Sequence, residues 1–269
     1  MDIIILFKAF ILGIVEGATE FLPISSTGHL IIVGDLLNFN DNKGNVFEIV
    51  IQLGAILAVC FEFRKRLLNT VSHLLNEPSA QGFAINLAIA FMPAALLGLA
   101  FHDYIKQYLF SPITVAIALI VGGFAILVIE KFTNHSDTKT IEAITKKQAL
   151  QIGLAQSLAL VPGVSRAGAT ILGGMMFGLT RQTATEFSFF LAIPIMFAAT
   201  GYDLLKSWRL LSMADLPMFA VGFITAFVSA LIVIKVLIKY VATHDFTGFA
   251  WYRIIFGSIV LAYFWWTNC

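Results

Sequence analysis

Residues 16–29 read EGATEFLPISSTGH and residues 162–170 read PGVSRAGAT, two polar strings in an otherwise apolar chain. They lie inside two apolar stretches, Phe7 to Leu37 and Ala149 to Leu179. Each half of a stretch has only about 10 to 14 residues, too few to span a bilayer alone. Pro and Gly within the strings interrupt a helix, and such breaks are tolerated at membrane depth where protein or a water-filled cavity surrounds them. The pattern therefore predicts two re-entrant helical hairpins.

The composition around these strings is that of an integral membrane protein. Of 269 residues, 59% are hydrophobic and 12% charged, and the mean hydropathy is +0.88. We therefore expect an all-α protein with six transmembrane helices besides the hairpins, because six segments approach the length of about 20 residues that a span requires. These segments are Val46 to Phe63, Phe83 to Phe101, Ile113 to Phe132, Thr185 to Leu205, Leu216 to Tyr240 and Thr247 to Trp266. A net charge of +1, with no basic run beyond residues 64–66, argues against a nucleic-acid partner.

The two halves of the chain resemble each other. Residues 13–16 match residues 153–156 in spacing, and residues 23–26 match residues 162–165 if a gap of a residue or two is allowed. Glu48 and Glu186 open the spans that follow. One transmembrane domain would then consist of a repeat at 1–147 and a second at 148–269, each with a hairpin and three spans. Three spans are an odd number, so the second repeat would be inverted; the alternative is chance similarity between broken apolar stretches.

Lys and Arg predict the orientation. The loops on the side of the N-terminus hold five of them, and the opposite loops hold eleven. The positive-inside rule then places both termini outside the cytoplasm. The first group is Lys8, Lys43, Lys106, Lys206 and Arg209, and the second is Arg64, Lys65, Arg66, Lys131, Lys139, Lys146, Lys147, Arg181, Lys235, Lys239 and Arg253.

Two carboxylates one helical turn apart point to a cation. Glu16 and Glu20 share a helix face, and like charges in a low-dielectric setting repel unless a positive charge lies near them. A divalent cation such as Mg²⁺ or Ca²⁺ would satisfy both, because hard cations bind one or two carboxylates together with phosphate oxygens. The alternative is an ion pair between one glutamate and Arg166, with the other glutamate solvated.

The rest of each string predicts an anion site. Ser25, Ser26 and Thr27 begin one half-helix, and Ser165 and Arg166 begin another. Helix N-termini and a guanidinium group both favour phosphate oxygens, so two such starts describe a diphosphate site; capping alone is the alternative for the hydroxyls. A histidine one turn inside the first half-helix, His29, can donate a proton, accept one or accept a phosphoryl group.

These strings resemble the signatures of the undecaprenyl-diphosphate phosphatase family of bacterial inner-membrane proteins, also called bacitracin-resistance proteins. The first signature, E-x-x-x-E followed by F-L-P-x-S-S-T-G-H, is complete at residues 16–29, and the second, P-G-x-S-R-S-G-x-T, has Ala167 in place of its second serine. The resemblance covers nearly the whole chain. The departure makes a role for position 167 doubtful and leaves Ser165, Arg166 and Thr170 unaffected.

The resemblance implies a metal-dependent hydrolase that removes the terminal phosphate of a polyprenyl diphosphate at the outer face of the inner membrane. This reaction recycles the lipid carrier of peptidoglycan synthesis and confers bacitracin resistance. The roles implied are listed by position: catalysis by Glu16, Glu20, Ser26 and His29, metal binding by Glu16 and Glu20, and diphosphate binding by Arg166, Ser165, Thr170, Ser25, Thr27 and Gly163. The nucleophile stays open between water activated by Glu20 or His29 and Ser26 with His29 as base, and a homodimer is one option for the assembly.

Two other functions compete with this interpretation. A polyprenyl-phosphate flippase or transporter would use the same inverted repeat, but it would not need a carboxylate pair beside a Ser/His pair. An acid-phosphatase-type lipid phosphatase would require a second histidine and an aspartate downstream of its S-R pair, whereas no His occurs between Arg166 and His244.

Overall fold

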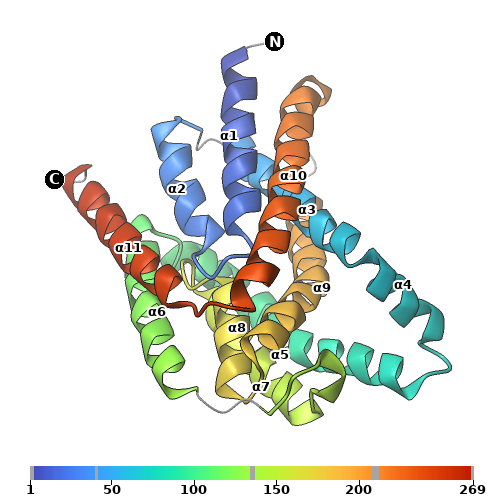
Figure 1. The fold of residues 1–269 in the computed structure, drawn as a ribbon. Helices are drawn as coiled ribbons and strands as arrows, with labels where there is room; N and C mark the ends of the chain where they lie inside the picture. Colours follow the sequence, from blue (N-terminus) through green and yellow to red (C-terminus); the bar gives the residue numbers. More distant parts are fainter. Residues whose placement is uncertain (1–2, 40–41, 134–136, 208–211, 268–269) are drawn as a thin grey trace.

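The computed structural model describes residues 3–39, 42–133, 137–207 and 212–267 (Figure 1). Within these ranges the chain is helical, and its only bridge of β type joins Thr138 and Leu179. The helices are α1 (Ile3–Thr19), α2 (Ser26–Leu36), α3 (Asn42–Glu62), α4 (Arg64–His73), α5 (Pro78–Tyr108), α6 (Pro112–Phe132), η1 (Ile141–Ala143), α7 (Lys146–Gln156), η2 (Ser157–Leu160), α8 (Arg166–Met176), α9 (Arg181–Ser207), η4 (Met213–Asp215), α10 (Leu216–Val241) and α11 (Thr247–Thr267).

The long helices agree with the predicted membrane protein. Five of them, α5, α6, α9, α10 and α11, are long and apolar enough to cross a bilayer. A sixth span results only if α3 and α4 count as one, because α4 bends away from α3 by 71°. Pro78 and Pro112 begin α5 and α6, where a missing backbone N–H has no cost. The structure thus confirms an all-helical protein with five to six candidate spans, while their passage through a membrane in the predicted order stays a prediction.

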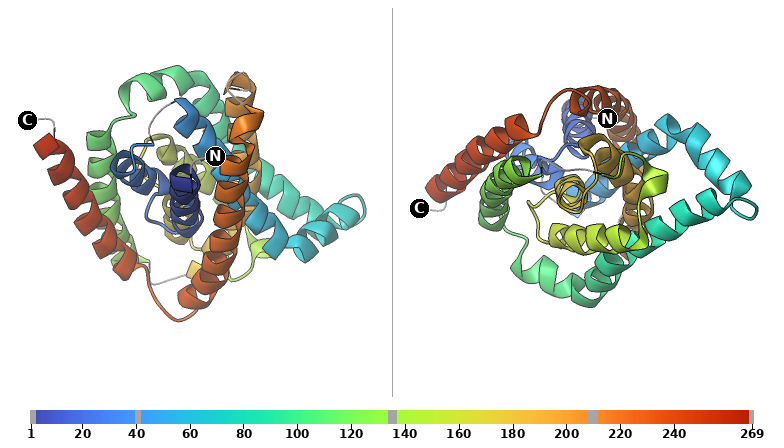
Figure 2. Two further views of the ribbon diagram at one scale, coloured as in Figure 1. Left: turned by 90° about the horizontal axis from the view of Figure 1, so that it is seen from above. Right: turned by 60° about the horizontal axis from the view of Figure 1, so that its bottom comes forward.

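Both polar strings interrupt helices, as predicted. The chain turns between α1 and α2 and again between α7 and α8, where η2 extends the first helix. The α1–α2 hairpin comes from the top of Figure 1 and the α7–α8 hairpin from the bottom, and their turns approach each other in the middle of the molecule. Figure 2 shows the longer helices around both hairpins. The first half is longer than expected, because α1 has 17 residues.

Glycines at matching positions allow each hairpin to pack closely on a long helix. A Cβ atom on Gly13 of α1 would lie 2.5 Å from the carbonyl oxygen of Gly222 in α10. A Cβ atom on Gly153 of α7 would lie 2.5 Å from the carbonyl oxygen of Ala90 in α5. These glycines allow α1 to pack on α10 and α7 to pack on α5. Any larger side chain at either position would force the helices apart.

The two hairpins match at a constant separation of 140 positions. The second helices, residues 26–36 and 166–176, both have 11 residues. The residue before each is a serine in left-handed backbone, with φ of 68° at Ser25 and 75° at Ser165. The predicted matching of residues 23–26 with 162–165 was therefore off by one, because Pro was aligned with Pro whereas the helix starts align Ser25 with Ser165. No gap is needed within the hairpins.

A buried arginine was wrongly counted among the orientation residues. Arg253 was counted as a loop cation, but it lies inside α11 with 1% of its surface exposed. A single charge near the end of an apolar segment cannot be distinguished from a loop charge by hydropathy. Arg209 lies outside the described residues, as do the side chains of Lys43 and Lys106.

Candidate functional site

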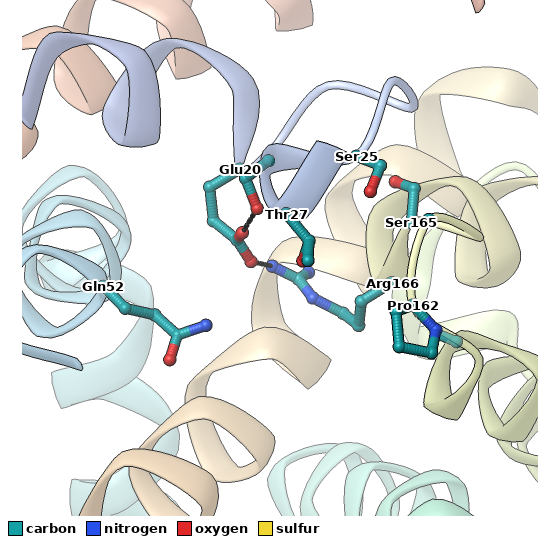
Figure 3. A pocket seen from close by; sticks show the side chains of 10 residues that line it. Glu20, Ser25, Thr27, Gln52, Pro162, Ser165 and Arg166 are labelled. Carbon is teal, nitrogen blue, oxygen red and sulfur yellow. Dashed lines mark hydrogen bonds and ion pairs between the residues drawn. The ribbon is translucent and has the colours of Figure 1, made fainter. Parts of the chain in front are cut away.

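The turns of both hairpins line one pocket. The pocket encloses about 170 Å³ and lies between the starts of α2 and α8, with Gln52 of α3 across from Pro162 and Ser165 (Figure 3). Its lining residues are Glu20, Ser25, Ser26, Thr27, Gln52, Ala159, Pro162, Gly163, Ser165 and Arg166. Eight of these ten belong to the two polar strings, so the structure brings the predicted strings together.

Glu20 joins the two hairpins. Its Oε1 accepts a hydrogen bond from Nη2 of Arg166 at 3.0 Å, and its Oε2 accepts one from Oγ of Ser26 at 2.5 Å (Figure 3). All three side chains are largely shielded from solvent. Removing one member of a buried ion pair leaves the other charge uncompensated, so Glu20 and Arg166 depend on each other. The ion pair that sequence reasoning left as an alternative is thus present, but the other glutamate, Glu16, is not solvated.

Arg166 has further partners in both halves of the chain. Its Nη1 donates to the carbonyl oxygen of Ser188 at 3.2 Å, and its guanidinium lies 5.5 Å from the ring centre of Phe21. Among the described residues its buried Nε has no hydrogen-bond partner. The side chain is therefore held in place from α9 and from the first hairpin, with donor capacity left over.

Both helices that start at the pocket present their N-termini to it. Oγ of Ser165 accepts from the backbone N–H of Gly168 at 3.0 Å and donates to the carbonyl oxygen of Leu22 at 3.4 Å. Ser25 occupies the same position in the first hairpin, yet its side chain caps no backbone N–H. The first N–H groups of a helix have no partner within the helix and attract anions when no cap satisfies them. The start of α2 is therefore the more open of the two anion sites.

His29 is not among the residues that line the pocket. Its Nδ1 lies 2.8 Å from the carbonyl oxygen of Ser25 and its Nε2 lies 2.7 Å from the hydroxyl of Tyr252. Its ring also stacks on Phe256 at 4.2 Å. Since the contact with a carbonyl requires an N–H, Nδ1 carries the proton and Nε2 accepts from Tyr252. Both ring nitrogens are thus engaged in holding the turn against α11.

Thr170 also lies outside the pocket lining. Its hydroxyl is 2.5 Å from the hydroxyl of Ser188 and donates to the carbonyl oxygen of Arg166 at 2.9 Å. These hydrogen bonds connect the first turn of α8 to Ser188 of α9. A direct contact of Thr170 with a diphosphate stays a prediction.

Glu16 offers an unsatisfied acceptor for a cation. It is 1% exposed, and among the described residues its Oε1 has no hydrogen-bond partner. In the same part of the chain no three His, Cys, Asp or Glu side chains converge as a full set of metal ligands. The unpartnered Oε1 of Glu16 fits a ligand of a hard cation such as Mg²⁺, whereas both oxygens of Glu20 already accept hydrogen bonds. Binding of one cation by both carboxylates stays a prediction.

Four residues of the site region escaped sequence reasoning. They are Gln52, which lines the pocket, Ser188, which contacts Arg166 and Thr170, Tyr252, which contacts His29, and Arg253, which contacts both turns. Gln52 carried the same signal as the polar strings, a polar side chain within an apolar segment, whereas Arg253 resembled a loop cation. Tyr252 and Ser188 carried none, since both residue types are common in spans.

Comparison with known proteins gives one consistent family. The family model of the bacitracin resistance protein BacA matches residues 9–259. Curated relatives include a protein of Methylobacillus flagellatus that is 66% identical over 98% of this chain and 100% of its own length. Others are a protein of Nitrosospira multiformis, 59% identical over 97% of this chain and 96% of its own, and one of Laribacter hongkongensis, 57% identical over 100% and 99%.

All three relatives bear the name undecaprenyl-diphosphatase. Their names agree with the phosphatase resemblance and do not favour the transporter or the acid-phosphatase alternative. The match extends over nearly the whole chain, both polar strings included. The chain therefore belongs to the family of the bacitracin resistance protein BacA.

Proposed function

We propose that this protein hydrolyses undecaprenyl diphosphate to undecaprenyl phosphate and inorganic phosphate. The observation that carries the proposal is the contact of Glu20 with both Ser26 and Arg166 at a pocket between two helix N-termini. An acceptor for a proton, a hydroxyl and a guanidinium group are the parts that phosphoryl transfer requires, since this reaction depends on positioning and on neutralisation of charge. The names of the curated relatives support the same substrate.

Ser26 is the nucleophile in this proposal and Glu20 is its base. The 2.5 Å contact between their oxygens allows the proton of Ser26 to pass to Glu20, whereas His29 is engaged with Ser25 and Tyr252. Oγ of Ser26 then bonds to the terminal phosphorus, the bond from that phosphorus to the bridging oxygen breaks, and the lipid monophosphate leaves. The oxygen of a water molecule next bonds to the phosphorus of the phosphoserine, and the bond from that phosphorus to Oγ of Ser26 breaks. Glu20 returns its proton to Oγ, inorganic phosphate departs, and the excess proton of the water passes to solvent.

Arg166 and the two helix starts bind the diphosphate. The N–H groups at the start of α2 and the guanidinium of Arg166 would contact phosphate oxygens, and Ser165, Thr27 and Gly163 would line the same space. A divalent cation, Mg²⁺ or Ca²⁺, held by Glu16 and Glu20 would supply further positive charge to the phosphate oxygens.

The location of the reaction is part of the proposal. A separation of 140 positions between matching hairpins that come from opposite ends of the bundle supports an inverted repeat of 1–147 and 148–269. With basic residues more frequent in the loops opposite the N-terminus, the first hairpin would enter from the periplasm, where both termini would lie. The pocket would then open to the periplasm. The reaction there would recycle the carrier lipid of peptidoglycan synthesis, and this recycling would account for bacitracin resistance.

Phosphate release by the purified protein tests the proposal. We expect the wild-type protein to release phosphate from undecaprenyl diphosphate in detergent, and Ser26→Ala to lower the rate by at least about 10²-fold because the nucleophile is absent. Rapid acid quenching with substrate labelled at the terminal phosphate should trap labelled phosphoserine at position 26. Ser72→Ala, which removes an exposed hydroxyl of α4, is the matched control and should keep the wild-type rate.

Two results would contradict it. A wild-type protein that binds the lipid without releasing phosphate would show that hydrolysis is not its function. A Ser26→Ala variant that keeps more than about a tenth of the wild-type rate would assign the attack to water, since loss of a covalent nucleophile should reduce the rate far more.

A further inference from the structure

Arg253 is a buried arginine that holds the turns of both hairpins. All five of its N–H groups donate to backbone carbonyl oxygens, and the side chain is 1% exposed. The acceptors are Pro23 (3.0 Å), Val164 (2.9 Å), Gly163 (3.0 Å), Ala118 (3.0 Å) and Leu119 (3.2 Å). A guanidinium has five donors in a fixed planar fork, so its full capacity is used here.

Three of these carbonyls lie outside any helix and need a hydrogen-bond donor from elsewhere in the molecule. Pro23 lies in the first turn, and Gly163 and Val164 lie in the second. Carbonyl groups in buried non-helical backbone lose their contacts with water and must find another partner. Arg253 provides that partner for both turns from a single group, so the two turns share one support.

The groove for this side chain is built into α6. A Cβ atom on Gly122 would lie 2.1 Å from Nη2 of Arg253 and 2.6 Å from its Cζ. Glycine at this position therefore leaves the space that the guanidinium fills. A methyl group there would push Arg253 off its five acceptors without altering Arg253 itself.

The supported turns are the ones that start α2 and α8. Gly163 lines the pocket, and Ser25 and Ser26 follow Pro23 directly. The separation of the two helix starts decides whether Arg166 reaches Glu20. No ion pair in the described part of the chain involves Arg253, so its charge also adds to the positive potential behind both helix N-termini.

We propose that Arg253 is a positioning residue that fixes the two hairpin turns at the separation required to bind and cleave the diphosphate. The inference rests on the proposed function. It differs from a role in folding alone, because it places the effect on the rate and on anion binding of the folded protein. Small displacements of catalytic groups lower rates strongly, by up to about 10²-fold for 1 Å.

Two variants disturb the support from opposite sides. In Arg253→Lys the charge is kept but at most three donors are available, and in Gly122→Ala the arginine is kept but its groove is filled. We expect both folded variants to have kcat reduced by about 10-fold or more, in line with the rate loss caused by misplaced groups. Gly82→Ala is the matched control, because a Cβ atom at Gly82 meets no atom within 4 Å.

Melting temperature and size-exclusion behaviour identify the folded fraction to which kcat is referred. The melting temperature is also measured with inorganic diphosphate, whose stabilising effect should be smaller in both variants than in the Gly82→Ala control because the helix starts are displaced. Wild-type kcat and an unchanged diphosphate effect in folded Arg253→Lys and Gly122→Ala would overturn the inference. If the wild-type protein releases no phosphate, the proposed function fails, while the diphosphate effect on the melting temperature still tests the support.

Discussion

The two hairpin turns have the same backbone and different chemistry. Ser25 and Ser165 precede helices of equal length in the same unusual conformation. At matching positions the first hairpin has Glu16, Glu20 and Ser26, whereas the second has Gln156, Leu160 and Arg166. The carboxylates and the reactive hydroxyl thus belong to one hairpin, and the guanidinium belongs to the other.

This difference shows how a repeated scaffold can form one site. In the described part of the chain, Glu20 pairs with Arg166 and with no cation of its own hairpin, and residues 146–176, the hairpin of Arg166, contain no carboxylate. Each buried charge is neutralised only when the turns meet, since unpaired buried charges are strongly unfavourable. Because the charged groups of the site come from different hairpins, the pocket forms only when the two hairpins pack together.

The largest expected effect comes from removing either half of the contact between the turns. Glu20→Gln and Arg166→Ala should each lower phosphate release by about 10²- to 10³-fold, because each removes a proton acceptor or a charge at the transferred group. The double variant should be little slower than either single variant, since both act on one unit. Steady-state phosphate release of all three variants checks this.

The matched control removes an exposed pair of the same residue types. Arg66 and Glu142 form an ion pair away from the pocket, so Arg66→Ala and Glu142→Gln should leave kcat unchanged. The double variant of Glu20 and Arg166 provides the contrary outcome. If its fold-loss in rate equals the product of the two single fold-losses, Glu20 and Arg166 act independently and the contact between the turns has no catalytic role.

A smaller loss is expected when the first hairpin is made more like the second. Glu16→Gln places in α1 the residue type that α7 has at Gln156, where the side chain is equally buried with an unpartnered Oε1 among the described residues. The fold should therefore tolerate the change. We expect phosphate release to fall about 10- to 10²-fold at low Mg²⁺ and to recover partly at high Mg²⁺, because one carboxylate ligand of a hard cation is lost.

Titration of Mg²⁺ and Ca²⁺ after treatment with a chelator measures this dependence. Glu142→Gln, which removes an exposed carboxylate away from the pocket, is the control and should leave the cation requirement unchanged. An activity that persists in excess chelator, or a Glu16→Gln variant with the wild-type cation requirement, would remove the cation from this pair of carboxylates.

Much of the site could be predicted from the sequence because polar groups are rare in apolar segments. Both hairpins, their turns and the presence of Glu20, Ser26 and Arg166 at one pocket followed from that rarity together with Pro and Gly. The pairing register was off by one because aligned prolines gave a stronger signal than the helix starts. A serine in left-handed backbone cannot be recognised from its residue type.

The directions of side chains could not be predicted. Helix periodicity places His29 near Ser26, but its ring lies against α11, because Tyr252 and Phe256 provide contacts that exist only after helices far apart in sequence have packed. Likewise, Arg253 resembled a loop cation until five carbonyl acceptors from three segments surrounded it. Such partners are set by tertiary packing, which hydropathy and motif spacing do not describe.

The position of His29 gives a third prediction, on a feature that only the first hairpin has. His29→Ala should lower kcat by about 10-fold through displacement of Ser25, and Tyr252→Phe by a few-fold, because a group that supports the geometry contributes less than the proton acceptor itself. The pH dependence of kcat/KM should keep its shape in both variants. If a limb of the profile disappears in His29→Ala but not in Tyr252→Phe, the imidazole transfers a proton in the reaction.

The smallest expected effect separates the two serines that start the helices. Ser165→Ala removes the hydrogen bond from Gly168 and should lower the free energy of unfolding by about 1 kcal/mol, the usual value of an N-cap. Ser25→Ala removes no cap and should change it by less than about 0.5 kcal/mol, as for a substitution away from such contacts. Both variants keep a β-carbon in the same left-handed backbone, so strain cancels in the comparison.

Unfolding in mixed detergent micelles with increasing SDS measures both free energies. Equal losses would show that Ser25 has a stabilising contact of its own, and the start of α2 would then be no more open to an anion than the start of α8. A loss confined to Ser165→Ala would leave the N–H groups of α2 free for phosphate oxygens. The second hairpin would then be the self-capped one, and the first would be the one whose helix start is completed by the substrate.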